Sequence, residues 1–211
     1  MKNVRFYSML AVVSILSPLA SMARAENAPV TWSEADTGRI VRDVQKKVAA
    51  LSQYGVFDDI HFGIKGKKIV LQGYASRPTL KSSAESAVKG IAGVEGVENQ
   101  IEVLPLSPMD DRVRAEAYNK IFLSAPLRKY NANAGGAFRG LSVQRMAGGI
   151  TNDPPIGFHA IHIIVKNGNI ILRGAVLNQS DADIAQIQAN TVSGVFSVTN
   201  ELGIEGSTPG K

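Results

Sequence analysis

Cysteine is absent from the 211 residues of the chain. Its absence excludes disulfides, thiolate metal ligands, a cysteine nucleophile and a lipid-modified cysteine behind an export signal. There are only three histidines, His61, His159 and His162. His159 and His162 are an odd number of positions apart, so on a strand they would face opposite sides of the sheet and could not easily share one metal ion. We therefore expect no metal site and no cofactor.

The patterns of common catalytic sites are also missing. The sequence has no P-loop, no GxGxxG before a helix and no Ser/His/Asp arrangement. Its acidic pairs, such as Asp58-Asp59 and Asp110-Asp111, stand where helices and turns are expected to begin, and carboxylates favour such positions. No GxxG loop joins two helices, as a KH-type RNA module would require. We expect a protein that is not an enzyme and that binds neither a small-molecule substrate nor nucleic acid.

Long apolar runs are scarce, and the N-terminal one is short. Residues 1–25 have the features of a cleaved signal peptide: a basic start, an apolar stretch from Met9 to Leu16, and Ala23-Arg24-Ala25 as the cleavage site. The alternative is an uncleaved anchor, but the apolar stretch is short for a bilayer span. Removing three basic residues lowers the formal net charge from +5 to about +2. We expect a periplasmic or secreted protein without a lipid anchor, and the high pI is not a sign of nucleic-acid binding.

What the chain does have is one stretch in two copies. FDDIHFGIKGKKIVLQG begins at Phe57, and FHAIHIIVKNGNIILRG begins at Phe158, 101 positions later and without a gap. Each copy is predicted to be a β-hairpin, because Gly66-Lys67 suits a type II′ turn and Asn167-Gly168 a type I′ turn. A two-residue loop fixes the register, so that Ile64 faces Ile69 and their apolar neighbours share one face.

Each hairpin lies inside a longer repeat of the order α-β-β-α-β. Repeat 1 covers about 36–104, a proline-containing linker covers 105–109, and repeat 2 covers 110–205. We expect an α+β protein of two tandem modules, each a three-stranded mixed sheet with two helices on one face. Repeat 2 carries an insertion at about 126–155, between its first helix and its hairpin.

Helical spacing marks the helices that flank the hairpins. Ile40, Val44 and Val48 form one stripe of a helix from about 36 to 51, and residues 26–35 are expected to be a poorly ordered lead-in. The first helix of repeat 2 is predicted from Arg112 to about Phe122, at an offset of 73 from the first. Thr79 and Ser180 are the expected N-caps of the second helices.

The outer sheet faces of the two repeats differ. Repeat 2 places Ile164 opposite Ile171 on the face away from its helices, where repeat 1 has Gly63 and Val70. Burying an isoleucine contributes roughly 1.5–3 kcal/mol. We therefore predict that Ile164 and Ile171 form a contact with repeat 1, with the insertion or with a partner.

The repeats resemble the BON domain, a module of bacterial envelope proteins. The resemblance lies in I-x-x-x-x-I-x-L-x-G at 64–73 followed by GVEGVENQIEV at 93–103, and in V-x-x-x-x-I-x-L-x-G at 165–174 followed by GVFSVTNELGI at 194–204. It implies a mixed three-stranded sheet, an envelope location, no catalysis, and attachment to phospholipid membranes or envelope partners. Lacking a lipidated cysteine, the chain is more similar to the osmotically inducible periplasmic type.

The insertion departs from the compact module. No acidic residue occurs between Tyr118 and Asn152, and a cationic, glycine-rich segment with scattered apolar residues could lie on an anionic headgroup layer. The alternatives are an ordered loop that covers the sheet face, and disorder. The residues predicted to contact lipid or another surface are Arg128, Lys129, Phe138, Arg139, Leu141, Arg145 and Met146.

Two functional hypotheses follow. In the first, the two modules bind phospholipid surfaces and support envelope integrity under osmotic or other stress. In the second, they form a protein–protein interaction module that assembles an envelope or secretion complex. Only the first predicts salt-sensitive affinity for anionic lipid. The oligomeric state remains open.

Overall fold

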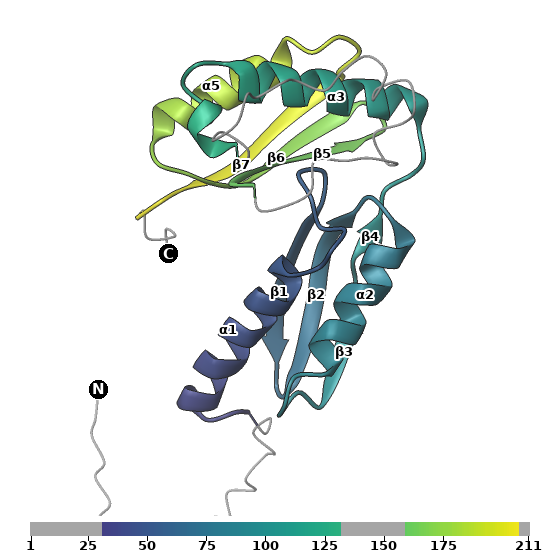
Figure 1. Cartoon of the computed structure of the whole chain (residues 1–211), viewed down its shortest axis with the longest axis vertical. Coiled ribbons are helices and arrows are strands. Elements are labelled where there is room, and N and C mark those ends of the chain that lie inside the picture. Colours follow the sequence, from purple (N-terminus) through teal and green to yellow (C-terminus); the bar gives the residue numbers. More distant parts are fainter. Residues whose placement is uncertain (1–30, 132–158, 207–211) are drawn as a thin grey trace, which may run out of the picture.

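Figure 1 shows the chain as a computed structural model, which describes residues 31–131 and 159–206. Module 1 contains α1 (Glu34–Ala49), β1 (Asp59–Lys65), β2 (Lys68–Ala75), α2 (Pro78–Lys89), β3 (Gly96–Asn99) and β4 (Glu102–Val103). Module 2 contains α3 (Pro108–Leu123), η1 (Arg128–Tyr130), β5 (Ile161–Lys166), β6 (Asn169–Val176), α5 (Gln179–Asn190) and β7 (Ser197–Ile204).

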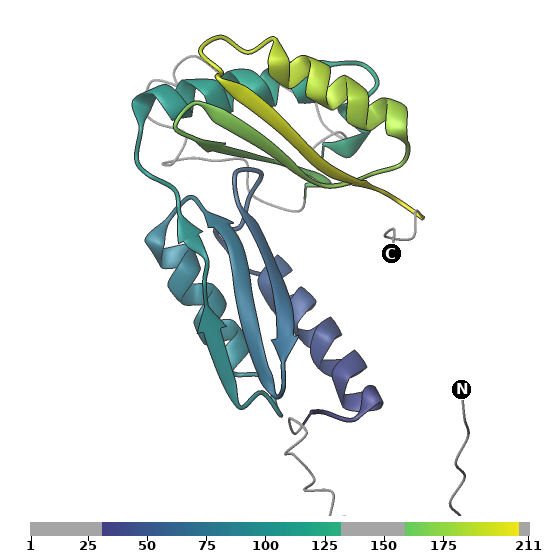
Figure 2. The same ribbon diagram turned by 180° about the vertical axis from the view of Figure 1, so that it is seen from behind.

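Each module is a mixed sheet with two helices on one face. The strand orders are β1-β2-β3 and β5-β6-β7, with the hairpins antiparallel and the last strand parallel to the middle one. In module 1 the last strand is interrupted, and β4 continues it beside β2. Figures 1 and 2 show α1 and α2 on one face of the first sheet, and α3 and α5 on one face of the second. The predicted α+β class and the two-module architecture are confirmed.

The turns set the hairpin registers. Gly66 has a φ of 62°, as the first central residue of a type II′ turn requires. In the second hairpin the φ angles of Asn167 (51°) and Gly168 (74°) are both positive, as a type I′ turn requires. Ile64 pairs with Ile69 and Val165 with Ile170, as predicted.

The second strand of each hairpin contains a glycine that is required for steric reasons. Gly73 and Gly174 have φ values of 110° and 113°. A Cβ at Gly73 would collide with the carbonyl oxygen of Asp59, and one at Gly174 with that of Ala160. Only glycine therefore lets the partner strand approach at these equivalent places.

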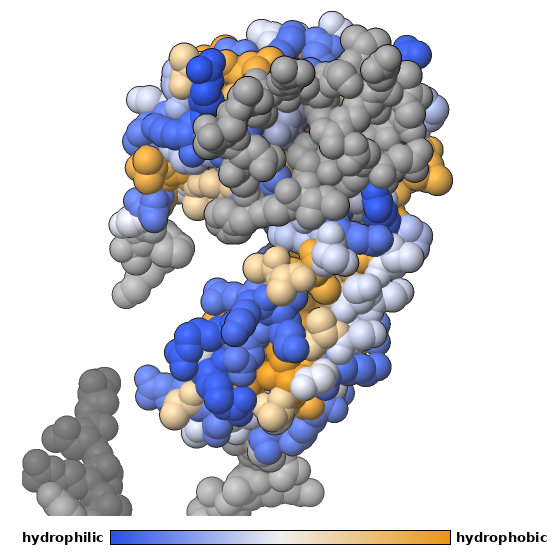
Figure 3. Space-filling model, viewed as in Figure 1, coloured by the Kyte–Doolittle hydropathy of each residue, from blue (hydrophilic) through white to orange (hydrophobic). Residues whose placement is uncertain are grey.

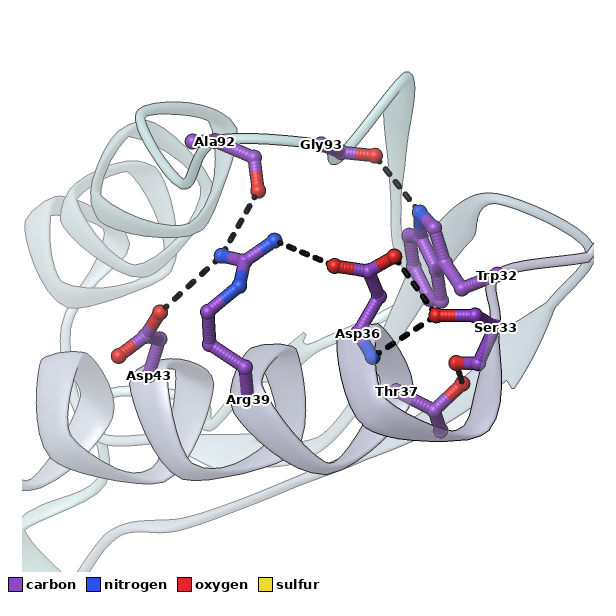
Figure 4. A network of polar contacts seen from close by, with 8 residues as sticks. All are labelled: Trp32, Ser33, Asp36, Thr37, Arg39, Asp43, Ala92 and Gly93. Carbon is purple, nitrogen blue, oxygen red and sulfur yellow. Dashed lines mark hydrogen bonds and ion pairs between the residues drawn. The ribbon is translucent and has the colours of Figure 1, made fainter.

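The helix starts depart from the predictions. Helix α1 begins at Glu34 because the Ser33 side chain accepts a hydrogen bond from the Asp36 amide. The preceding residue is also ordered: the Trp32 indole donates a 2.8 Å hydrogen bond to the Gly93 carbonyl (Figure 4). The prediction of a poorly ordered lead-in was therefore wrong for residues 32–35.

The predicted N-caps of the second helices were also wrong. Helix α2 starts at Pro78, and the Thr79 hydroxyl donates to Gln53 instead. In α5 the cap is Asn178, whose side chain accepts from the Asp181 amide, rather than Ser180. Asparagine before the helix satisfies the free amides as well as serine does.

Helix α3 starts four residues before the predicted Arg112. Ser107 caps it, and Pro108 occupies the first turn, where its missing N–H has no consequence. The second acidic pair does more than favour a helix start. The buried Asp110 carboxylate accepts hydrogen bonds from the amides of Asn167 (2.9 Å) and Gly168 (2.8 Å), and so holds the second hairpin turn.

Apolar stripes of the helices make the two cores. Ile40, Val44 and Val48 of α1 are buried on the sheet, as predicted. Figure 3 shows hydrophilic side chains over the outward face of α1. Within the described ranges 31–131 and 159–206, no helix is both long and apolar enough to cross a membrane.

Candidate functional site

The edge strands β1 and β5 are equivalent in the repeat, but among the described residues a cover is found for β5 alone. Each is hydrogen-bonded to its sheet on one side only. In β5 the helix-facing residues Ile163 and Val165 are 0% exposed, whereas Ile64, the counterpart of Val165 in β1, is 42% exposed. The two strands therefore have different surroundings despite their common pattern.

A loop of module 1 covers one half of β5. The Ile163 amide donates a 2.8 Å hydrogen bond to the carbonyl of Val56, which lies between α1 and β1. Val56 and Phe57 are 0% and 1% exposed and belong to the core of module 2. The Phe57 ring meets that of Tyr118 edge to face, with centroids 6.3 Å apart. Module 1 thus supplies part of its neighbour's core.

A buried arginine covers the other half of β5. Arg114 of α3 is 1% exposed and donates a 2.7 Å hydrogen bond to the Val165 carbonyl. Asp111 accepts from the same guanidinium at 2.6 Å. At the repeat offset of 73, these two positions correspond to Val41 and Gly38 of α1. Module 1 therefore has neither the donor nor its carboxylate.

The repeat also shows which backbone groups of β1 point away from its sheet. The Ile163 amide and the Val165 carbonyl point away from the β5–β6 pair and form hydrogen bonds with Val56 and Arg114. At the equivalent positions of β1, Phe62 and Ile64 therefore direct their backbone groups away from β2. Ile60 continues the series, and its amide reaches the Tyr54 hydroxyl. Burial raises the pKa of Tyr54, and this amide opposes the shift. For Phe62 and Ile64, no such partner occurs among the described residues.

A groove runs along this open edge. Its cavity volume is about 740 Å³, within the range of ligand sites. Figure 2 shows β1 at the outer edge of its sheet with α1 beside it. The lining contains no carboxylate and consists of Val41, Gln45, Val48, Ala49, Tyr54, Ile60, His61, Phe62, Gly63, Ile64 and His162. It can bind an apolar, extended ligand that supplies backbone hydrogen bonds. We call it the β1 groove.

His162 closes one end of the β1 groove from module 2. Its Nδ1 lies 3.3 Å from the Gly55 carbonyl, which can only accept, and its ring centroid lies 5.4 Å from that of Tyr54. Burial lowers the pKa of His162, which favours the neutral ring. The groove is therefore built partly from the junction between the modules.

Ion pairs flank the same junction. Arg173 of β6 lies 3.2 Å from the Asp59 carboxylate, and Lys166 of β5 lies 2.6 Å from that of Glu102. Asp59 and Glu102 both pair with Tyr74, so they mark one end of the first sheet. That end stands against the helix-free face of β5 and β6.

The two isoleucines of that helix-free face lie between these ion pairs by register. Ile164 is 0% exposed, and its pairing partner Ile171 is half-buried. That these two side chains themselves contact module 1, the insertion or a partner remains a prediction.

Two of the residues predicted to contact lipid are described. Arg128 is exposed in η1, and Lys129 forms a 2.7 Å ion pair with Asp181. The hydrogen bond with the Asp181 carboxylate raises the pKa of Lys129 and lowers that of Asp181. Lys129 is therefore committed to an internal contact. Phe138, Arg139, Leu141, Arg145 and Met146 lie outside the described residues.

The histidines separate into different surroundings. His61 lies 3.2 Å from Asp59 on the surface, whereas His159 and His162 are buried. Across residues 31–131 and 159–206, no group of three or more His, Cys, Asp or Glu side chains could hold a metal ion.

Sequence reasoning missed the coverage of β5. It placed Phe57 within the first hairpin unit, whereas the ring is buried in the other module. One signal was present: Arg114 stands beside the apolar stripe of the first helix of repeat 2, where repeat 1 has the apolar Val41. A charged residue in such a position indicates a buried backbone acceptor nearby.

Comparisons with known proteins bear on the family. Two solved structures of CdsD, a structural protein of the type III secretion system of Chlamydia trachomatis, are similar at 16% identity, with TM-scores of 0.25 and 0.24. They cover 78% and 79% of this chain, which covers 96% and 92% of theirs. Similarity at these TM-scores carries no functional argument. No protein of curated function matches the chain.

The family model of the BON domain matches residues 36–105 and 147–206. The BON domain is generally non-catalytic and indicates an envelope-associated role. Each matched region contains one hairpin, and together they cover more than half of the sequence. The chain therefore belongs to the BON domain family, with two domains in tandem.

Proposed function

We propose that this protein is a non-catalytic assembly module of the cell envelope, which binds another envelope protein through the β1 groove. One observation carries the proposal: β5 is covered by Val56 and Arg114, while no residue of 31–131 or 159–206 covers the equivalent edge of β1. An uncovered edge strand is a template for pairing with another chain.

Physical chemistry favours a protein ligand here. Ile64 is 42% exposed and Phe62 is half-buried beside it. Covering such residues contributes about 25 cal/mol per Å² of apolar surface. Backbone groups of β1 would add hydrogen bonds worth about 0.5–1.5 kcal/mol each. A lipid acyl chain could use the apolar surface but would leave the backbone groups unpaired.

The test uses a photo-crosslinking amino acid at position 64 in the full chain. Its control carries the same group at Phe196, which is 83% exposed on module 2. The expected result is a discrete adduct with one envelope protein from position 64 alone. The adduct should disappear when Val41→Arg and Gly38→Asp together reproduce the covered edge of β5. Identical adducts from both positions, or from the covered variant, would overturn the proposal.

A second candidate function is that the protein binds phospholipid surfaces and thereby supports the envelope under stress. It is favoured by Arg128, whose side chain is exposed and in no ion pair within the described part of the chain. Co-sedimentation with anionic vesicles tests it, comparing the mature chain with a variant in which Arg128, Arg139 and Arg145 are serine. Salt-sensitive binding that the variant loses supports this candidate, and unchanged sedimentation rejects it.

A further inference from the structure

Resting on the proposed function, we infer the chemistry of the partner: an extended, acidic segment with apolar side chains at alternate positions, which adds to the sheet as a new edge strand beside β1. The first ground is the geometry of the open edge. Phe62 and Ile64 present their amides and carbonyls outward, so a strand can form up to four hydrogen bonds with them, by the count of groups per residue.

The protein itself contains the precedent for this pairing. Gly55 and Val56 lie along β5, and the Val56 carbonyl accepts from Ile163, the equivalent of Phe62. Phe57 then turns an apolar side chain into the module core. In module 2 the edge strand thus already pairs, through one backbone hydrogen bond, with an apolar turn of the chain at this position. In module 1 the same place is a groove.

The ends of the β1 groove limit the length of the segment. At one end the Ile60 amide already bonds to the Tyr54 hydroxyl, and His162 lines the cavity. At the other end β1 finishes at Lys65 in the hairpin turn. Pairing is therefore confined to the two residues Phe62 and Ile64 and their neighbours. A strand rises about 3.3 Å per residue, so a segment of about five residues fills it.

Alternation follows from the two faces of the added strand. Beside Ile60, Phe62 and Ile64, its side chains on one face would meet Val41, Gln45 and Ala49 of α1, which line the cavity. Side chains on the other face would lie beside His61 and Gly63, which are exposed. Apolar residues suit the first face and polar residues the second.

Charge determines the preference for acidic residues. No carboxylate lines the β1 groove. Arg42 and Lys46 directly follow the lining residues Val41 and Gln45 on α1 and are exposed, with no ion pair in residues 31–131 and 159–206. Lys65, at the end of β1, is 72% exposed in its side chain and lies 3.3 Å from the Glu98 carboxylate. The positive charge on this side of the molecule would attract a segment with carboxylates and repel a basic one.

The experiment measures binding of a synthetic fluorescent peptide, Glu-Val-Thr-Val-Glu-Val-Thr, to the mature full chain by anisotropy. Three matched peptides are compared with it. One has the same composition but its three valines adjacent, one has lysine in place of each glutamate, and one is N-methylated at alternate amides. We expect the parent peptide to bind more tightly than any of the three. Loss of one hydrogen bond should weaken binding about two- to tenfold. Slowed hydrogen exchange at the amides of Phe62 and Ile64 should accompany binding.

Two variants locate the site. Val41→Arg with Gly38→Asp should weaken the parent peptide at least about tenfold, because the arginine takes the Ile64 carbonyl and fills the cavity. Ile64→Glu is the second variant, at an already exposed position, and should repel the acidic peptide without affecting folding. Binding that is unchanged in the folded variants overturns the inference, as does equal affinity for the lysine or rearranged peptide.

The outcomes also separate this inference from the proposed function. If the peptide fails to bind while the adduct at position 64 persists and is lost on covering the edge, the β1 groove binds a protein, but not by strand addition of this chemistry. Sedimentation of the free chain gives the remaining outcome. A dimer that the covered variant abolishes would make a second copy the occupant and overturn the inference.

Discussion

The amide of Ile163 in module 2 donates to the carbonyl of Val56 in module 1 at 2.8 Å. This bond joins the edge of one sheet to the loop before the other. Together with the burial of Phe57 in the second core, it makes the repeats unequal. Module 2 is complete only with its neighbour in place, whereas module 1 has a core of its own.

Phe57→Ala should therefore destabilise module 2 and not module 1. Removing a buried phenylalanine costs about 3–5 kcal/mol. Trp32 is the only tryptophan and packs on the core of module 1, so its fluorescence reports that module alone. In urea, circular dichroism should show an early transition that Trp32 fluorescence does not follow. Leu106→Ala, at a position 83% exposed, is the control and should leave both midpoints unchanged. Coincident early transitions would contradict separate dependence of the modules.

Arg114→Leu should destabilise module 2 because it leaves the Val165 carbonyl and Asp111 without their donor. An unpaired buried acceptor costs about 1–3 kcal/mol. The double variant with Asp111→Gly reproduces the edge of module 1, removes the unpaired carboxylate and should recover part of the loss. Urea unfolding followed by circular dichroism measures both. A double variant no more stable than the single one would show that Asp111 has another role.

The fold followed from the sequence where local pattern and packing agree. The hairpin registers depend on two-residue turns and on apolar alternation, and both act within one repeat. The burial of Phe57 in module 2 depends instead on a contact across the repeats. Its apolar side chain is equally consistent with a core of either module, so periodicity cannot assign it.

The candidate site was predictable only in part. Comparing the repeats column by column exposes Arg114 against Val41, but that difference gains meaning only once the Val165 carbonyl is seen beside the guanidinium. Likewise, the basic composition of the insertion suggested a surface contact. It could not show that Lys129 is held by Asp181, which lies 52 positions away along the chain.

Gly174→Ala should be strongly destabilising, since its φ of 113° and the Ala160 carbonyl both exclude a Cβ. Strain of this kind costs about 1–3 kcal/mol before the collision is counted. Gly63→Ala is the matched control, because nothing lies within 4 Å of an added Cβ there. Thermal unfolding should show a large loss for the first and little change for the second. Equal midpoints would contradict the close approach of the strands.

Acidification should lower the free energy of unfolding through protonation of His162. Burial lowers the pKa of this ring from the model-compound value of 6.5, so below that value the unfolded chain binds a proton that the folded chain does not. Stability is therefore fully present above pH 6.5 and falls as the pH decreases toward the lowered value. The buried Asp58 acts in the opposite sense, because burial raises its pKa, so the two effects must be separated.

A pair of variants makes this separation. Urea midpoints from about pH 7.5 to about pH 5 should decline more steeply for the native chain than for His162→Gln, which cannot titrate in this range. His61→Gln, at a side chain that is 46% exposed, is measured alongside as the comparison for loss of a histidine outside the buried junction. Because His162 contacts Gly55 and lines the β1 groove, the same protonation should loosen the module junction at the end of the groove. If His162→Gln keeps the native slope, another group governs the acid sensitivity, and His162 does not couple pH to the junction.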